Sequence, residues 1–276
     1  MPSDQRTLLM DLGNTRLKWC ALSDANGSLT GVHAIPHADA DFRSALRAGL
    51  QSQLWQRIWI ASVGPPDVHA RIERACHELL PGVPIGYARS LAKCGGLHNG
   101  YDTPSQLGVD RFLSLLAASE HWPQQRVLIA SIGSAVTVDL LEPDGRHAGG
   151  LIAPSSWAMR SALAGLAPQL AVADVQAGTA FARDTASGIA SGCTLAVVGL
   201  IEHCMRVAAH GSAPVLVLSG GGAAALAPSL PIASTVLPYL ALSGLASYAR
   251  LHPMDDHQEF SHSVRGDHMP VERFEP

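Results

Sequence analysis

The chain has 276 residues, of which 47% are hydrophobic and 15% are charged, so it has enough apolar material for one large domain or two of ordinary size. The net charge of -4 and the lack of a basic stripe interleaved with aromatic residues argue against direct nucleic-acid binding. No run approaches the roughly 20 apolar residues of a membrane span, and residues 1–6 lack the apolar centre of a signal peptide. We therefore expect a cytoplasmic protein, whose five cysteines, without C-x-x-C spacing, are reduced thiols.

The first predicted feature is a β-hairpin with a turn suited to phosphate. The apolar run 8–10 predicts a buried strand, the Gly-Asn pair after it predicts a tight turn, and the alternation over 17–22 predicts a second strand. Its tip combines a carboxylate, a glycine, hydrogen-bonding side chains and a lysine, which suit a nucleotide triphosphate with its metal ion. An ordinary hairpin, in which the aspartate only stabilises the turn, is the alternative. The segment consists of Asp11, Leu12, Gly13, Asn14, Thr15, Arg16, Leu17 and Lys18.

The rest of the first half is predicted to alternate strands with helices. Apolar residues at helical spacing, such as Phe42 and Leu46, indicate the first helix. Asp39 or Asp41 would cap that helix, and Asp67 would cap the second. The expected elements are strands at 31–35, 57–62 and 83–87, and helices at 41–50, 68–80 and 106–121.

The pattern begins again after Pro123, at an offset of 120 residues. Ser131 falls on Asp11, Gly133 on Gly13, and Ser134 on Asn14. A repeat of this length indicates a duplicated domain rather than a solenoid. We expect an α/β protein with an N-terminal half at 1–122, a C-terminal half at 123–251 and a polar tail at 252–276. The second half should contain strands at 127–130, 148–152, 215–218 and 232–236, a strand after the second turn, and helices at 155–166, 185–209 and 240–251.

Two such hairpins would place two phosphate-holding turns on either side of a cleft, with a third glycine run at a strand end. That run is Gly220, Gly221 and Gly222. Neither turn is a P-loop, because G-x-x-x-x-G-K-[ST] is absent, and no G-x-G-x-x-G fingerprint follows a strand. The chemistry indicated is phosphoryl transfer on a duplicated scaffold.

Four motifs lie along the chain at 11–15, 108–111, 149–154 and 220–222. In this order they resemble the motifs of the type III pantothenate kinases, also called Bvg accessory factor proteins. The resemblance runs from about residue 8 to residue 251. It implies ATP-dependent phosphorylation of pantothenate to 4'-phosphopantothenate, which opens coenzyme A synthesis. It also implies the duplicated ribonuclease H-like fold of the actin, sugar kinase and Hsp70 (ASKHA) superfamily, with the site between the halves. Family members are homodimers that use Mg2+ and a monovalent cation, K+ or NH4+.

By this resemblance Asp110 is the general base, and Tyr101, Gly108, Val109 and Arg111 contact pantothenate. A positioned carboxylate that removes the proton of an attacking alcohol contributes on the order of 10²- to 10⁴-fold. Arg111 would keep the neighbouring Asp110 ionised and bind the substrate carboxylate. The alternative from spacing alone is a surface ion pair between Asp110 and Arg111.

The resemblance also assigns the nucleotide side. Asp11 would serve the phosphates and Mg2+ through water, Ser134 matches a phosphate-contacting threonine, and Gly220 to Gly222 match the adenosine loop. Thr185 matches a threonine that reaches pantothenate across the dimer interface, although a helix cap would explain it almost as well.

Ser131 departs from the family, which has an aspartate associated with the monovalent cation at this position. A neutral hydroxyl cannot replace that charge, so dependence on the cation is in doubt. Asp139 is a nearby carboxylate without an assigned role. Because of Ser131, a second hypothesis stays open: a nucleotide-binding regulatory or transcription accessory protein with the same fold. A third hypothesis is a kinase for another small hydroxy compound, which the segment 101–111 disfavours.

Overall fold

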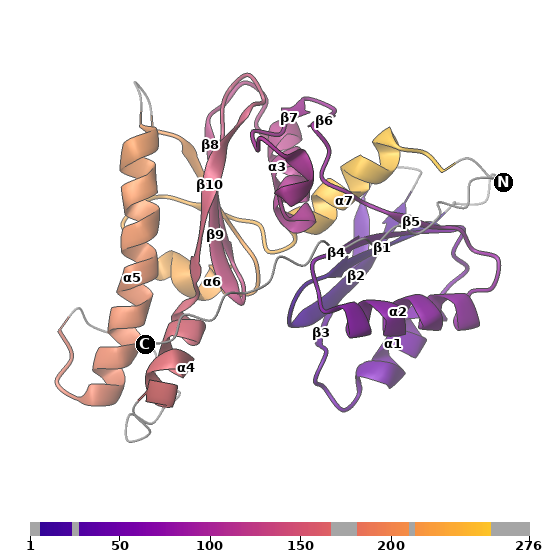
Figure 1. Cartoon of the computed structure of the whole chain (residues 1–276), viewed down its shortest axis with the longest axis horizontal. Coiled ribbons are helices and arrows are strands. Elements are labelled where there is room, and N and C mark those ends of the chain that lie inside the picture. The colour runs from indigo at the N-terminus through magenta and orange to yellow at the C-terminus, as the bar shows by residue number, and fades with distance from the viewer. Residues whose placement is uncertain (1–5, 24–27, 167–180, 210–212, 255–276) are drawn as a thin grey trace.

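The computed structural model describes residues 6–23, 28–166, 181–209 and 213–254. Figure 1 shows two sheets, with α3 (Val109–His121) and α7 (Leu240–Leu251) lying between them. Each sheet has five strands. The duplication predicted from the sequence is therefore confirmed.

The first sheet has the order β3-β2-β1-β4-β5. Strand β2 pairs antiparallel with β1 and with β3, whereas β4 runs parallel to β1 and β5 parallel to β4. Asp11, near the end of β1, lies opposite Lys18 of β2. The strands are β1 (Arg6–Leu12), β2 (Arg16–Ser23), β3 (Leu29–Pro36), β4 (Arg57–Ser62) and β5 (Ile85–Tyr87).

The second sheet repeats this arrangement in the order β10-β9-β8-β11-β12. Ser131 has the same place in β8 that Asp11 has in β1, and it lies opposite Thr137 as Asp11 lies opposite Lys18. The offset of 120 residues therefore aligns equivalent positions. The strands are β8 (Val127–Ile132), β9 (Ala135–Leu141), β10 (His147–Pro154), β11 (Val215–Ser219) and β12 (Thr235–Val236).

The remaining helices cover the outer faces of the two sheets. Helices α1 (Phe42–Leu50) and α2 (Pro66–Leu79) pack their apolar residues against the first sheet. Helices α4 (Ser156–Leu166), α5 (Thr185–Ala208) and α6 (Ala223–Leu226) lie against the second. A short hairpin precedes α3, formed by β6 (Lys93–Cys94) and β7 (Leu97–His98), with single 3-10 turns at Pro104–Gln106 and Ala227–Ser229.

A shared hydrophobic core joins the two halves. It combines Leu9 and Trp59 of the first sheet, Ile129 and Val217 of the second, and Phe112 of α3. Helix α7, the last element of the second half, contacts both α3 and strand β1. Because both helices are covered on two sides, the N-terminus of α3 is fixed relative to both sheets.

Several local predictions need correction. Helix α3 begins at Val109, after a separate 3-10 turn, instead of near residue 106. Helix α2 has Pro65 at its N-cap and Pro66 at its first position, which suits a residue without an N–H, so Asp67 lies in the first turn. Asp41 occupies the N-cap of α1 without a side-chain capping bond. The expected strand 232–236 is reduced to β12.

Helix α5 differs from the expectation that no segment approaches a membrane span. Its 24 residues are long and apolar enough to cross a membrane by length and composition. One such helix is weak evidence, because core helices of globular proteins meet the same criteria. One face of α5 is buried against the second sheet. The predicted tail lies outside the described residues, apart from 252–254.

Candidate active site

The structure brings the two predicted phosphate turns together. In the first turn the amide of Gly13 donates to the carbonyl of Arg16 at 3.1 Å, and in the second the amide of Gly133 donates to Ala135 at 2.9 Å. The hydroxyl groups of Thr15 and Ser134 form a hydrogen bond across the halves. The hairpin tips therefore meet, with exposed hydroxyl groups between them.

The third glycine run closes the same region. The amide of Gly222 donates to the carbonyl of Ile132 at 3.0 Å, at the end of β8. Gly220 has φ +84, and a Cβ there would lie 2.5 Å from the Ile132 carbonyl oxygen, so this approach requires glycine. A Cβ at Gly221 would lie 3.9 Å from Nη1 of Arg16. The three predicted nucleotide loops thus converge.

Asp11 and Lys18 form an ion pair at the base of the first turn. Lys18 Nζ lies 2.9 Å from Asp11 Oδ2, and the side chain of Asp11 is 5% exposed against 23% for Lys18. Their positions follow from the direct pairing of the two residues across β1 and β2. A buried carboxylate with a partly exposed cation beside it is suited to a metal-bound polyphosphate, since Mg2+ takes one or two carboxylates and substrate phosphates.

Asp110 lies in the first turn of α3, beside the end of β1. A Cβ at Gly108, the N-cap residue, would lie 3.9 Å from Cγ1 of Val63, whose amide bonds to Leu12 of β1. The amide of Arg111 donates to Asp110 Oδ1 at 2.8 Å. Val109 packs in the central core, so its side chain is not free to contact a ligand.

Burial raises the pKa of Asp110, and the negative charge of Asp11 raises it further. The backbone hydrogen bond and positive charge of Arg111 oppose this shift without overcoming it. Arg111 therefore favours the ionised form of Asp110, as expected, but burial and the charge of Asp11 outweigh its effect on the pKa. A carboxyl with raised proton affinity near a phosphate turn is suited to general-base catalysis.

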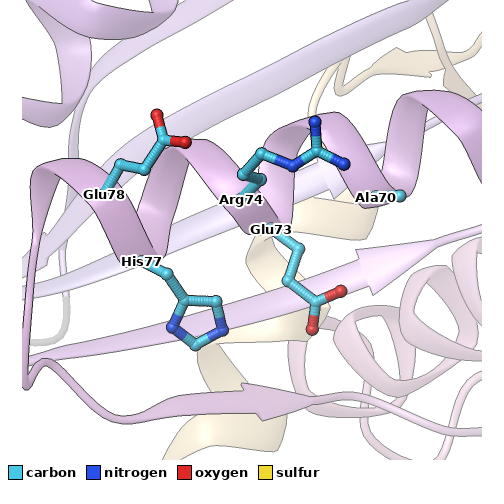
Figure 2. A pocket seen from close by; sticks show the side chains of 5 residues that line it. All are labelled: Ala70, Glu73, Arg74, His77 and Glu78. Carbon is cyan, nitrogen blue, oxygen red and sulfur yellow. The ribbon is translucent and has the colours of Figure 1, made fainter.

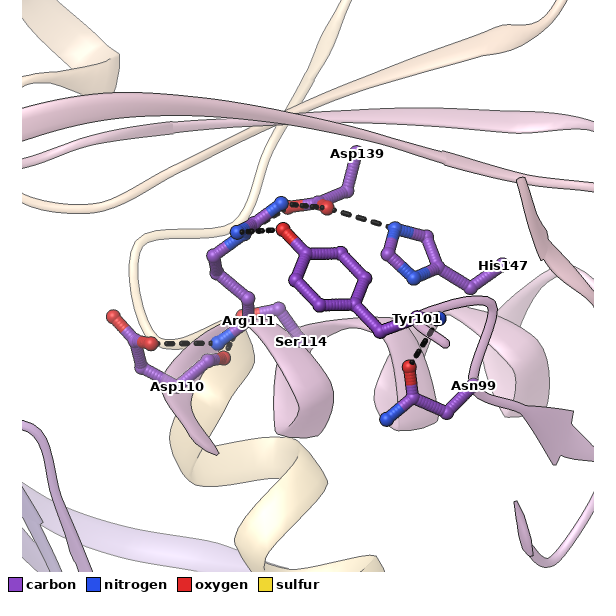
Figure 3. Close-up of polar contacts among 7 residues, drawn as sticks. All are labelled: Asn99, Tyr101, Asp110, Arg111, Ser114, Asp139 and His147. Atoms are coloured by element: carbon purple, nitrogen blue, oxygen red, sulfur yellow. Dashed lines mark hydrogen bonds and ion pairs between the residues drawn. The ribbon is translucent and has the colours of Figure 1, made fainter. Parts of the chain in front are cut away.

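Arg111 pairs with Asp139 and not with Asp110 (Figure 3). Its Nε donates to Asp139 Oδ2 at 2.9 Å, its Nη2 to Oδ1 at 2.6 Å, and its Nη1 to the hydroxyl of Tyr101 at 2.9 Å. Burial lowers the pKa of Arg111, but the hydrogen bonds and charge of Asp139 raise it above its ordinary value on balance. With Arg111 only 6% exposed, the alternative of a surface ion pair is also wrong.

Sequence reasoning missed His147. It begins β10, is fully buried, and its Nε2 lies 2.9 Å from Asp139 Oδ1. Since an ionised carboxylate only accepts, Nε2 is the donor. The one sequence signal that could have identified His147 as a site residue was its position just before Gly149 and Gly150 of a predicted motif.

Thr185 is not brought to this site within the chain. It is the exposed first residue of α5, which covers the face of the second sheet opposite α3. The carboxylate of Asp184 accepts from the amide of Ser187 at 2.9 Å, and these hydrogen bonds lower the pKa of Asp184. Asp184 therefore caps the helix, and the capping alternative for Thr185 is wrong.

Ser131 lies in register with Thr137 on one side and Ser219 on the other. A neutral row of hydroxyl-bearing residues thus occupies the second half, where the first half has the Asp11–Lys18 pair. Within the described ranges, no group of three or more His, Cys, Asp or Glu side chains could hold a metal ion.

A separate hollow lies on the outer side of α2 (Figure 2). Its volume is about 520 Å³, and it contains none of the predicted site residues. Helix α2 buries the opposite face against the first sheet. The hollow is lined by Ala70, Glu73, Arg74, His77 and Glu78.

The duplicated sheets and converging turns give the duplicated α/β fold that was expected for the actin, sugar kinase and Hsp70 type of protein. Solved structures agree with this fold. A Campylobacter jejuni protein described as a Baf family transcriptional activator matches with a TM-score of 0.56 at 19% identity, covering 88% of this chain and 97% of that one. The activator of 2-hydroxyisocaproyl-CoA dehydratase from Clostridium difficile matches with a TM-score of 0.51 at 12% identity, covering 89% and 94%.

Sequence relatives narrow this class to one family. The family model described as type III pantothenate kinase matches residues 7–207. Type III pantothenate kinase from Burkholderia multivorans is 39% identical over 259 residues, covering 88% of this chain and 95% of the relative. That from Paraburkholderia phytofirmans is 35% identical over 266 residues, covering 90% and 97%. The chain belongs to the type III pantothenate kinase family.

Proposed function

We propose that this protein transfers the γ-phosphoryl group of ATP to pantothenate, forming 4'-phosphopantothenate in the first step of coenzyme A synthesis. Family membership supports the substrates. The observation that carries the mechanism is the placement of Asp110 beside the end of β1, within the electrostatic influence of Asp11. The experiment is ADP release that requires pantothenate, with the phosphorylated product identified by its mass.

Asp110 acts as the general base in this proposal. Its carboxylate takes the proton of the primary hydroxyl as that oxygen attacks the γ-phosphorus and the bond to the β-phosphate oxygen breaks. The raised pKa of Asp110 strengthens its hold on that proton. The helix amide that donates to Oδ1 fixes the carboxylate for this transfer.

The three converging loops hold ATP. The amides and hydroxyl groups of the first turn and Ser134 of the second bind the phosphates, with Lys18 adding positive charge. Gly220 to Gly222 leave space for the adenosine against the backbone. Asp11 would be the residue that holds Mg2+, through water, and the ion would supply positive charge against the transferring phosphoryl group.

Tyr101 and Arg111 bind pantothenate. Asp139 already balances the charge of Arg111. Three N–H groups of Arg111 donate to Asp139 and Tyr101, and the remaining N–H groups are oriented to donate to the substrate. Gly108 and Val109 contribute through the backbone, since Val109 is buried. This adds a neutralising partner, Asp139, to the expectation that Arg111 binds the substrate carboxylate.

The monovalent cation, K+ or NH4+, has a weak role in this protein. Ser131, Thr137 and Ser219 supply only neutral oxygens along their three strands. Such oxygens can coordinate a cation but do not attract it as a carboxylate does. We propose that turnover changes little when K+ is replaced by Na+.

The protein forms a homodimer through the outer surface of the second half. Large apolar side chains are exposed there on three neighbouring elements. In the described part of the chain, nothing outside the helix backbone and the adjacent residues lies within 4 Å of a Cβ built at Gly192 or Gly199 of α5. A second copy would cover this surface, and Thr185 of one copy would reach the pantothenate site of the other. We also propose that the protein is cytoplasmic and that its domains are the halves 1–122 and 123–251, followed by the tail 252–276. The exposed residues are Leu151, Trp157, Leu195 and Val207.

A regulatory accessory protein is the second candidate, favoured by the neutral Ser131. It would bind nucleotide without turnover on pantothenate. Binding of ATP measured beside pantothenate-dependent ADP release distinguishes the two. The third hypothesis, a kinase for another small hydroxy compound, is tested by screening such compounds for ADP release in the same assay.

A further inference from the structure

Four side chains around the proposed pantothenate site form a closed ring of contacts (Figure 3). Arg111 donates to Asp139 through Nε and Nη2, and Asp139 accepts from His147 at 2.9 Å. The His147 ring stacks on Tyr101, with centroids 5.8 Å apart and an interplanar angle of 15°. The hydroxyl of Tyr101 accepts from Arg111, which closes the ring.

We propose that Asp139 and His147 are positioning residues, which hold Arg111 and Tyr101 in the conformation that binds pantothenate. This inference rests on the proposed function. Neither residue was assigned a role by the motifs. Both lie on paired strands of the second sheet, whereas Tyr101 lies in a loop and Arg111 in the first turn of a helix. The strands are therefore the fixed side of the ring.

Three side chains of the ring are shielded from water, so the loss of any one of their contacts is costly in free energy. Arg111, Asp139 and His147 are 6%, 3% and 0% exposed. Asp139 Oδ1 accepts from both Arg111 and His147, so loss of either donor changes how the other is held. A buried polar group that loses its partner has no water to replace it.

Two glycines make room for this ring, and one of them, Gly150, belongs to a predicted motif. A Cβ at Gly150 would lie 2.2 Å from Asp139 Oδ1 and 2.5 Å from Arg111 Nη2. A Cβ at Gly100, just before Tyr101, would lie 1.8 Å from the carbonyl oxygen of His147. The loop, the helix start and β10 thus approach one another closely at the ring itself.

The test is steady-state kinetics of the full chain with pantothenate and ATP varied separately. Asp139→Asn should raise the KM for pantothenate about tenfold or more, because a charged hydrogen-bond partner is lost, while the KM for ATP stays within twofold. His147→Phe keeps the ring stacked on Tyr101 but removes the donor, so we expect a rise of about fivefold for pantothenate. His147→Gln restores an N–H and should recover most of that loss. His98→Gln, an exposed histidine of β7, is the matched control.

The double variant Asp139→Asn, His147→Phe separates positioning from general packing. If His147 acts through Asp139, adding His147→Phe to Asp139→Asn changes the KM for pantothenate by less than twofold. If Asp139→Asn does not fold, the comparison of His147→Phe with His147→Gln decides. Equal effects on both KM values, or no recovery with His147→Gln, would overturn the inference. Failure of the wild type to turn over pantothenate would instead refute the proposed function, and the inference with it.

Discussion

Gly150→Ala should disrupt the Arg111–Asp139 pair with a single methyl group. The added Cβ would lie 2.2 Å from Asp139 Oδ1, 2.5 Å from Arg111 Nη2 and 2.6 Å from the carbonyl oxygen of Val138. The side-chain atoms can yield only by breaking their ion pair. The Val138 carbonyl belongs to β9, which is paired on both sides, so it cannot move freely.

The expected cost follows from these contacts. Overpacking alone costs about 1–3 kcal/mol, and separating a buried ion pair costs about 3–5 kcal/mol. Because the strand can relax in part, we expect a loss of about 3 kcal/mol in the free energy of unfolding, together with a pantothenate KM raised about tenfold. The KM for ATP should stay within about twofold, since the nearest atoms to the added Cβ belong to Asp139, Arg111 and Val138 and not to the three loops.

Denaturant unfolding and separate titration of the two substrates measure these effects. Gly165→Ala in α4 is the control, because among the described residues nothing outside the helix backbone and the adjacent residues lies within 4 Å of the Cβ it would add. It should leave both KM values unchanged. A Gly150→Ala protein that is destabilised by less than about 0.5 kcal/mol, with normal KM for pantothenate, would refute the argument that the ring needs this glycine.

Three further predictions concern charge and assembly. Because the pKa of Asp110 is raised, kcat/KM should begin to fall with decreasing pH at a pH above the ordinary aspartate range. Asp11→Asn removes the charge repulsion and should move this acidic limb of the pH profile to lower pH. An unmoved acidic limb would contradict the electrostatic coupling of Asp11 with Asp110. Leu195→Glu on the exposed face of α5 should shift the sedimentation profile towards monomer and lower turnover at least about tenfold, whereas an unchanged dimer would exclude this face. Ser131→Asp should increase the stimulation of turnover by K+ over Na+ several-fold, and equal stimulation in both proteins would remove Ser131 from the cation site.

The pattern of the hairpins could be predicted because it is local. Alternation and turn residues located β1, β2 and β8, and the shared offset matched Ser131 to Asp11 before any contact was known. The central place of α7 could not be predicted in the same way. The apolar residues of α7 indicate that the helix is buried, but periodicity alone does not predict that it packs against the first sheet.

The partner of Arg111 shows why site predictions from neighbouring residues fail. Adjacent residues of a helix project in different directions, so proximity in sequence does not pair Arg111 with Asp110. Its partners come from β9 and from the loop before the helix, which only the packing of α3 against the second sheet brings together. His147 was missed for the same reason, since its contact with Asp139 depends on the pairing of β9 with β10.

The most direct measurement compares wild type with Asp110→Asn in pantothenate-dependent ADP release. Asp110 holds its proton more tightly in the folded than in the unfolded chain, so its ionisation lowers stability as pH rises through that range. The variant should therefore remain folded at neutral pH, with a free energy of unfolding at least equal to that of the wild type. We expect kcat to fall by at least about 10²-fold while ATP still binds. A folded variant that turns over pantothenate at the wild-type rate would contradict the assignment of Asp110 as the base.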